Sequence, residues 1–223
     1  MLNSIRYLLI LVGLIFYQVN IAQNGFVIGY NGGSFLRAQR NIQAYSQAFN
    51  LSSENELIQE MRMFGLYRGL VVGFKGGDDG FSLGVRWSTK KAESNWGENE
   101  ELKQKLRIRM NTVNLEMGFG SEELKAGFSI DVGGLKVHTK KVDKVNNTST
   151  KWEKFYAGGA LVSGGTLATG LTLFVELQKD AWEFRPFFQI PLGEMGILDD
   201  RTMRDYLYPG HNFGVSLSYV LGS

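Results

Sequence analysis

The chain contains no cysteine among its 223 residues. This absence excludes disulfide bonds, thiolate metal sites, a cysteine nucleophile and the lipid-modified cysteine of a lipoprotein. Proline is also scarce, with 3 residues, whereas glycine is abundant, with 28. Because glycine weakens a helix interior by about 1 kcal/mol relative to alanine, this composition favours twisted sheets over helix bundles.

Long hydrophobic runs and a strong excess of charge are missing as well. No segment after the N-terminal leader reaches about 18 consecutive apolar residues, so no transmembrane helix is predicted there. The net charge of +2 gives no indication that nucleic acid is a partner. Hydrophobic residues make up 43% of the chain, which is too apolar for disorder. The length is enough for one domain with a large core or a closed barrel.

Residues 1–23 have the pattern of a cleaved signal peptide. Arg6 supplies a positive charge, and the apolar run over residues 7–17 is about eleven residues long, too short to span a bilayer comfortably. We expect cleavage after residue 22 or 23, which leaves residues 24–223 as one barrel domain. An N-terminal membrane anchor is the alternative, but no basic stop-transfer cluster follows the run.

The segment over residues 81–88 sets the pattern for the rest of the chain. Its odd-numbered residues are Phe, Leu, Val and Trp, and its even-numbered residues are Ser, Gly, Arg and Ser. Successive side chains of a strand point to opposite faces, so one face of this segment is apolar and the other is polar. Similar alternation predicts eight strands, over residues 25–31, 66–75, 81–88, 108–119, 124–138, 167–177, 182–192 and 213–221.

Long and short connections alternate between these strands. The short ones are turns such as Gly76–Gly80, where glycine and aspartate supply positive φ angles. Residues 90–105, 139–154 and 193–211 are predicted as long polar loops, and residues 155–165 fit either the start of the sixth strand or a separate one. In the fourth strand the apolar frame shifts near Asn111, which predicts a bulge or a strand that rises out of the membrane.

The first long connection, over residues 35–64, changes to a helical period. Apolar residues recur at helical spacing, and Ser53 with Glu56 forms a capping box. The segment therefore predicts one or two short amphipathic helices, with a partly ordered loop as the alternative for its first half.

Three observations favour a membrane barrel over a soluble one. The long–short order of connections is typical of outer-membrane barrels with both chain ends in the periplasm. Aromatic residues lie near the strand ends on the apolar face, as in interfacial girdles. The polar face is rich in small residues, which relieve crowding inside a narrow barrel; they are Gly69, Gly73, Gly84, Gly118, Gly127, Gly170 and Gly214.

The predicted fold is therefore all-β: an eight-stranded antiparallel up-and-down transmembrane β-barrel with short helices in the first external loop. Over residues 25–223 this pattern resembles the small barrels of Gram-negative outer membranes. In length, leader and long first loop it looks closest to the PorT-like β-barrel proteins of the Bacteroidetes. The resemblance implies an outer-membrane location and a role that depends on external loops.

Charged residues of both signs lie in the inward frame of the predicted strands. In a narrow lumen they would pair, because an isolated buried charge is very costly. We expect Arg86 to pair with Glu116 on the adjacent strand, with Asp131 as a second acceptor. The cluster is interpreted as a closed salt-bridge plug or, alternatively, as an ion or proton path; its members are Lys75, Arg86, Glu116, Lys125, Asp131, Glu176, Glu183 and Arg185.

Three functions remain open from the sequence. The first is a non-enzymatic envelope protein, porin-like in fold, whose external loops bind a partner in an assembly or secretion complex. The second is a narrow pore for small solutes. The third is a hydrolase at the outer rim that acts on lipid or peptide through His138 or His211. A deacylase-like barrel would carry a serine two residues after the histidine, where this chain has Lys140 and Phe213.

The expected partners are outer-membrane lipids and lipopolysaccharide, together with an envelope protein. Lys140, Lys141 and Lys144 form a basic run that fits either contact with lipopolysaccharide phosphates or an ordinary solvated loop. No cofactor and no metal site are predicted.

Overall fold

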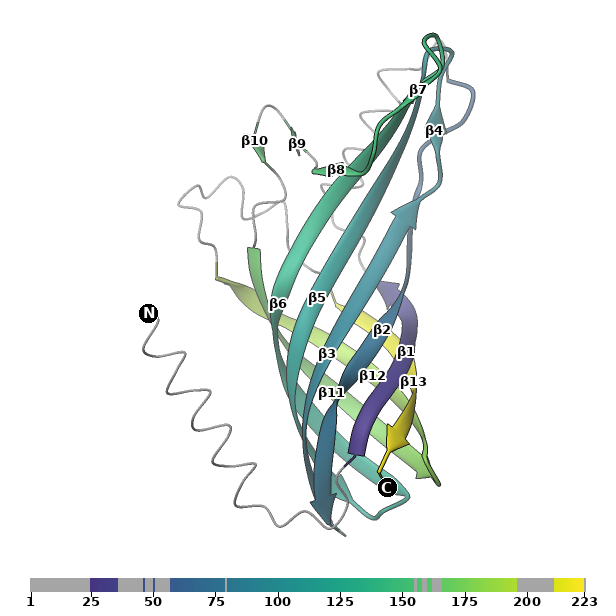
Figure 1. Ribbon diagram of the computed structural model, residues 1–223. Helices are drawn as coiled ribbons and strands as arrows, with labels where there is room; N and C mark the ends of the chain where they lie inside the picture. Colours follow the sequence, from purple (N-terminus) through teal and green to yellow (C-terminus); the bar gives the residue numbers. More distant parts are fainter. Residues whose placement is uncertain are drawn as a thin grey trace.

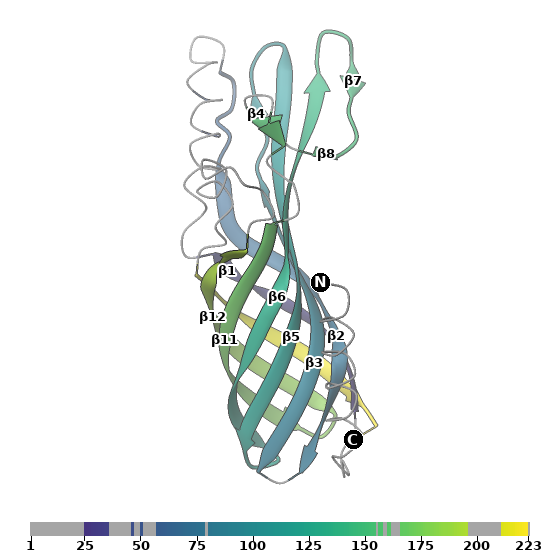
Figure 2. The same cartoon turned by 90° about the vertical axis from the view of Figure 1, so that its left-hand side faces the viewer.

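In the computed structural model, eight long antiparallel strands close into a barrel (Figures 1 and 2). The structure describes residues 25–35, 46, 50, 57–78, 80–154, 156–157, 160–161, 166–195 and 211–222. The barrel strands are β1 (Gly25–Phe35), β2 (Met63–Asp78), β3 (Phe81–Ser94), β5 (Leu102–Gly120), β6 (Leu124–Asp143), β11 (Thr166–Lys179), β12 (Trp182–Met195) and β13 (Asn212–Leu221). Each strand pairs with the next, and β1 pairs with β13 to close the ring. The predicted up-and-down transmembrane barrel is confirmed.

Three short turns lie at one end of the barrel and the longer connections lie at the other. The turns follow β2, β5 and β11, and two of them use a left-handed glycine: Gly80 has φ of 122° and Gly120 has φ of 143°. Phe26 pairs with Leu221, so both ends of the barrel domain lie at this short-turn end. The alternation of short and long connections, predicted from the apolar alternation of the strands and from the turn residues, is confirmed.

Two segments that were predicted as loops are largely strand. β3 continues to Ser94, β5 begins at Leu102 and β6 continues to Asp143. Three short strands lie beside their outer parts: β4 (Gly97–Glu98), β7 (Thr148–Ser149) and β8 (Glu153–Lys154). Together these strands form a tall sheet, here called the extension, that rises beyond the rim of the barrel (Figures 1 and 2).

The side chains of β5 explain why the extension was missed. Along the inward face, Leu106, Ile108 and Met110 are buried apolar residues, and from residue 112 onward the buried residues become polar. The outward face changes in the opposite sense, from Arg107 and Arg109 to exposed apolar side chains. These charged residues therefore belong to a strand whose outer face is in water, and they do not indicate a loop.

This inversion of polarity needs no bulge. The pairing of β5 with β3 and with β6 runs without a register shift through Asn111 and Thr112. Of the two alternatives for the shifted apolar frame, the bulge is wrong, and the strand continues straight beyond the membrane.

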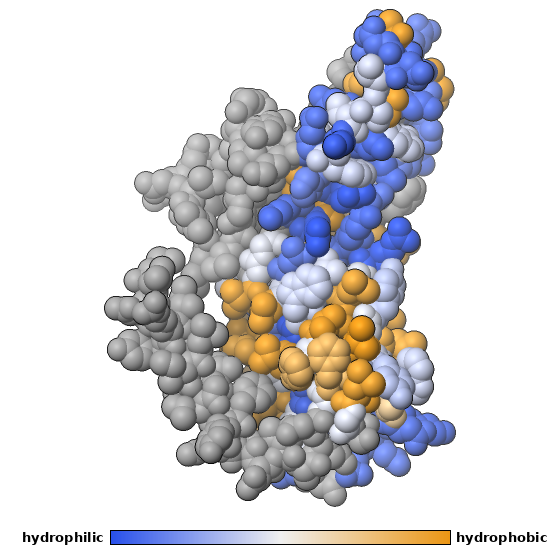
Figure 3. Space-filling view, in the orientation of Figure 1, coloured by the Kyte–Doolittle hydropathy of each residue, from blue (hydrophilic) through white to orange (hydrophobic). Residues whose placement is uncertain are grey.

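Below the inversion, the barrel carries a belt of outward apolar side chains. Figure 3 shows part of this belt as orange side chains across the visible face of the lower barrel, with the extension mainly blue above it. Such residues would be unfavourable in water at about 25 cal/mol per Å² of apolar surface. Belt residues include Ile28, Leu70, Phe74, Val113, Leu115, Ile130, Leu173, Val175, Val215 and Leu217, each more than a third exposed.

Aromatic pairs form a girdle at the short-turn end of the belt. The rings of Phe81 and Phe119 lie 5.4 Å apart, and those of Trp182 and Tyr219 lie 5.2 Å apart. Both pairs are cross-strand partners in the ladder. Amphipathic aromatics favour the membrane interface, so this ring marks one boundary of the hydrocarbon layer.

The helices predicted in the first connection fall mostly on residues outside the described ranges, as do the signal peptide and the capping box at Ser53. Residues 57–62 are described and are not helical: Gln59 forms a bridge with Glu98, and Phe64 already belongs to β2. In the ambiguous segment, β9 (Tyr156–Ala157) and β10 (Ala160–Leu161) pair with each other. No helix among the described residues is long and apolar enough to cross a bilayer.

The belt predicts that Leu83→Arg destabilises the barrel by about 2–4 kcal/mol, because the new charge would lie in the hydrocarbon layer. Ser82→Ala, on the inward face of the same strand, is the control and should cost far less. Refolding into lipid vesicles over a urea series measures both free energies. Equal effects of the two substitutions would contradict the assignment of the faces.

Candidate functional site

Six charged side chains meet inside the lower barrel in one connected cluster, here called the lumen cluster. Its members come from five strands: Lys75 from β2, Arg86 from β3, Glu116 from β5, Glu176 from β11, and Glu183 and Arg185 from β12. Three cations face three carboxylates, so the cluster has no net formal charge. Period-two alternation aims each of these side chains inward, and closure of the ring brings them together.

Arg86 is the centre of the lumen cluster. Its Nη1 and Nη2 donate hydrogen bonds to the two carboxylate oxygens of Glu183, at 2.5 and 2.9 Å. Nη2 also reaches Glu176 Oε2 at 3.3 Å. Arg86 is 2% exposed and Glu183 is 0% exposed. A forked, buried contact of this kind suits the planar guanidinium group.

The remaining members complete a continuous chain of ion pairs. Lys75 Nζ lies 2.8 Å from Glu176 Oε1 and 2.9 Å from Glu183 Oε2. Arg185 Nη1 donates to both oxygens of Glu116 at 2.8 Å, and its guanidinium carbon lies 3.4 Å from the ring centre of Phe174. The carboxylates are thus shared between neighbouring cations.

Arg86 and Glu116 do meet, as the sequence suggested for adjacent strands, but theirs is a secondary contact. Arg86 Nε lies 2.8 Å from Glu116 Oε2, without the alignment of a hydrogen bond. The main partner, Glu183, lies on β12, directly across the ring from β3. Strand alternation predicts neighbours in the ladder but not contacts across a lumen, which is why this pairing was missed.

Asp131 was expected to be a second acceptor for Arg86, and this expectation is wrong. Its carboxylate accepts hydrogen bonds from four neutral side chains above the lumen cluster: Asn114, Ser129, Thr172 and Gln189. It is 1% exposed. Four donors satisfy the charge without an ion pair, so Asp131 belongs to a separate, hydrogen-bonded layer.

Lys90 belongs to this upper layer and was not predicted, because it fell in the supposed loop. Its Nζ donates at 2.7 Å to Gln189 Oε1 and at 2.7 Å to Asn212 Oδ1. The ammonium group also lies 4.9 Å from the centre of the Phe187 ring. Lys125 is buried at the turn end, opposite Glu176 in register, and makes no ion pair with any described residue.

A cavity of about 40 Å³ lies between the two layers, lined by Arg86, Ser88, Lys90, Asn114 and Arg185 among others. Since one water needs roughly 10–15 Å³ of such volume, the cavity has room for about three waters. The cavity is too small for a solute.

The predicted catalytic histidines lie in different surroundings. His138 is on the outward face of β6, between Arg107 and Lys154 in register. His211 is exposed beside Phe188, with 5.9 Å between ring centres. Its predicted aspartate neighbours lie outside the described residues. No cluster of three or more potential ligands that could hold a metal occurs in the described part of the chain.

The outer surface of the extension carries charged side chains of both signs, and several of them pair. Glu93 lies 2.8 Å from Lys91, 2.9 Å from Lys105 and 2.8 Å from Arg107. Partial burial works to raise the pKa of Glu93, but hydrogen bonds from these three cations outweigh it and lower the pKa to about 2. Glu93 therefore stays ionised and serves three positive groups at once.

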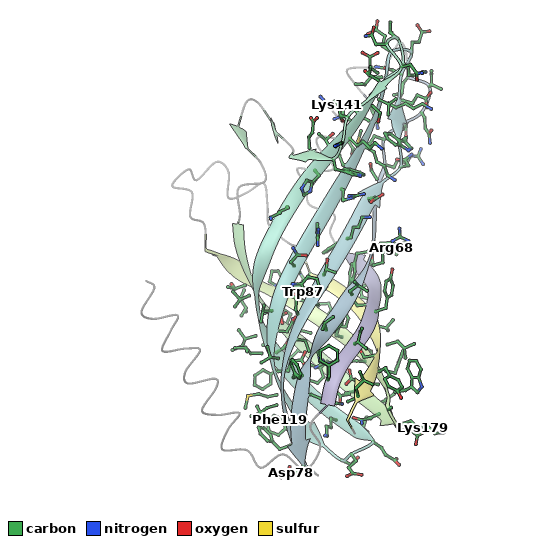
Figure 4. The ribbon with its side chains drawn as sticks, in the orientation of Figure 1. Arg68, Asp78, Trp87, Phe119, Lys141 and Lys179 are labelled. Carbon is green, nitrogen blue, oxygen red and sulfur yellow. The ribbon has the colours of Figure 1, made fainter. Side chains whose placement is uncertain are left out.

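The predicted basic run is divided between two situations. Lys144 Nζ lies 3.0 Å from Glu98 Oε1, so its charge is paired. Lys141 is exposed far out on the extension, as Figure 4 shows. The run is part of a β-hairpin and not of an irregular loop.

Comparison with known proteins gives no family. No family model matches the chain. No curated protein matches it significantly. The chain is similar to two structures of Ail, the attachment invasion locus protein of Yersinia pestis. One of them, a complex with the heparin analogue sucrose octasulfate, has a TM-score of 0.45 and 9% identity, and covers 89% of this chain and 96% of Ail. The other has a TM-score of 0.39 and 11% identity, and covers 89% and 95%.

The lumen cluster predicts strong coupling between Arg86 and Glu183. Glu183→Ala leaves Arg86 and Lys75 short of a counter-charge and should cost about 3–5 kcal/mol. The double variant Arg86→Met/Glu183→Met should cost much less than the sum of the two single Met substitutions, because no charge of that pair is left alone. Urea titration with heat-modifiable gel mobility as readout measures the cycle. Additive losses would contradict the contact.

Proposed function

We propose that the protein is an integral barrel of the Gram-negative outer membrane that acts through its extension and without catalysis. The location is supported by the apolar belt, the aromatic girdle and the signal peptide predicted over residues 1–23. The short turns then face the periplasm and the extension faces the cell exterior, as in other barrels of this class.

The observation that carries this function is the buried lumen cluster, which supports a closed lumen. Three cations and three carboxylates fill the lower barrel, and a second hydrogen-bonded layer lies above them. In this proposal the lumen cluster stabilises a barrel too narrow to pack an apolar core. A narrow pore, the second candidate, would need a hydrated path that the 40 Å³ cavity does not provide.

The extension is the part built to contact other molecules. Its inward face buries apolar residues, among them Leu106 and Val137, beside polar ones such as Gln104 and Thr139. Its outward face is charged and mostly basic, which favours contact with outer-leaflet lipid, lipopolysaccharide and an envelope protein. The resemblance to PorT-like barrels makes an envelope assembly or secretion complex the first place to search for that protein partner.

A rim hydrolase is the least supported candidate. His138 lies among basic side chains, and Lys140 stands two residues further on, where a deacylase-like barrel would carry its serine nucleophile. This candidate would be supported if the purified protein hydrolysed a glycolipid or peptide and if His138→Ala or His211→Ala abolished that activity.

The closed lumen predicts that the purified protein gives no steady conductance steps in planar bilayers. Arg86→Ala/Glu183→Ala removes the centre of the lumen cluster and should raise ion flux if the barrel stays folded. Leu83→Ala, a lipid-facing change on the same strand as Arg86, is the control and should remain silent. Regular conductance steps from the wild-type protein would favour the pore.

A further inference from the structure

Four basic residues form one straight row across the base of the extension. Arg68 pairs in register with Lys91, Lys91 with Arg109, and Arg109 with Lys136. The four side chains lie on the outward faces of β2, β3, β5 and β6. With strands about 4.8 Å apart, this row, here called the basic row, is about 14 Å long.

Carboxylates are almost missing from this surface. Lys91 is paired with Glu93, which also serves Lys105 and Arg107. Within the described residues, Arg68, Arg109 and Lys136 have no carboxylate at ion-pair distance; Arg109 donates only to the amide oxygen of Asn111. Like charges placed side by side on adjacent strands repel one another. Within the described part of the chain, the basic row therefore has no carboxylates that balance these three charges.

The height of the basic row indicates where anions that balance these charges would lie. A row of apolar residues lies four positions along each strand from the basic row, on the side of the belt. It consists of Val72, Trp87, Val113 and Val132, and it is the fully apolar row nearest to the extension. Four residues span about 13 Å along a strand, or about 10 Å along the membrane normal at a tilt of about 40°. Figure 4 shows the same order, with Arg68 between Trp87 in the belt and Lys141 far out on the extension.

A membrane headgroup layer would lie just below this height. It adds about 5–8 Å on each side of the hydrocarbon core, and Arg and Lys side chains reach toward it from above while their stems stay near apolar surface. Phosphate groups are the anions of that layer, and Arg binds them through a planar fork of donors.

We propose that the basic row binds the phosphate groups of an outer-leaflet glycolipid, with Arg68, Arg109 and Lys136 as the principal contacts. This inference rests on the proposed function, in that it takes the extension to face the exterior, and it names the lipid partner of that surface. It places the main contact at the base of the extension and not at the run Lys140–Lys144.

The test uses the full-length mature protein in detergent, titrated with bisphosphorylated lipid A and, separately, with the same glycolipid after enzymatic dephosphorylation. Wild-type protein should bind the phosphorylated form more tightly, and added salt should weaken the difference. Arg68→Gln/Arg109→Gln/Lys136→Gln should weaken that binding about 10–100-fold, as expected for the loss of three cations at a membrane surface. The matched control Lys141→Gln/Lys151→Gln/Lys179→Gln removes the same charge elsewhere and should bind as wild type does.

The outcomes separate this inference from the proposed function. Heat-modifiable mobility establishes that each variant is folded, and Arg68→Lys/Arg109→Lys, which keeps the charge, should retain most of the affinity. Equal binding by the row variant and wild type, or an equal loss in the control, would overturn the inference. If free inorganic phosphate at the same concentration displaced the glycolipid, the bound phosphate groups would not need to come from a lipid, and that part of the inference would be wrong. Failure of the proposed function would appear instead as absence of the protein from the outer-membrane fraction, whatever the titration gives.

Discussion

The structure depends on one constraint: a strand whose ladder is unbroken cannot exchange its two faces. β5 keeps one register with β6 over residues 102–120 and with β3 over residues 107–119, so its odd-numbered residues point outward throughout. Where the surroundings change from lipid to water, both faces must change polarity together. The sequence of β5 does this between residues 110 and 113, where apolar Met110 gives way inside to Thr112, and polar Asn111 gives way outside to Val113.

Closure of the ring imposes a second consequence. Eight strands leave a lumen too narrow for bulk water, so inward polar side chains must satisfy one another. Arg86 and Glu183 do so from opposite strands, and Asp131 does so through four neutral donors. Where an aromatic ring turns inward, a glycine makes room for it: a Cβ at Gly127 would lie 2.6 Å from the Phe174 ring. The same alternation of side chains therefore buries charged groups inside the barrel and places apolar side chains in the lipid.

Much of the fold followed from this alternation, and the errors follow from it as well. Eight strands and three short turns were predictable because each belt strand keeps an apolar outer face. The extension was mistaken for loops because residues such as Lys91 and Arg107 occupy the outward positions that are apolar lower down. Lys90 was not recognised as an inward residue because it lay in one of these supposed loops. Glu183 was recognised as inward, but alternation says nothing about contacts across a ring, so its pairing with Arg86 required the closed barrel.

Site-directed spin labelling along the outward face of β5 tests the inversion most directly. The chain has no native cysteine, so single Cys substitutions at residues 107, 109, 111, 113, 115, 117 and 119 give unambiguous labels in lipid vesicles. Collisions with a water-soluble nickel chelate should dominate at 107 and 109. Collisions with oxygen should dominate from 113 to 119, with the crossover near 111. One uniform environment along all seven positions, or labels at 113–119 that contact water, would contradict the account.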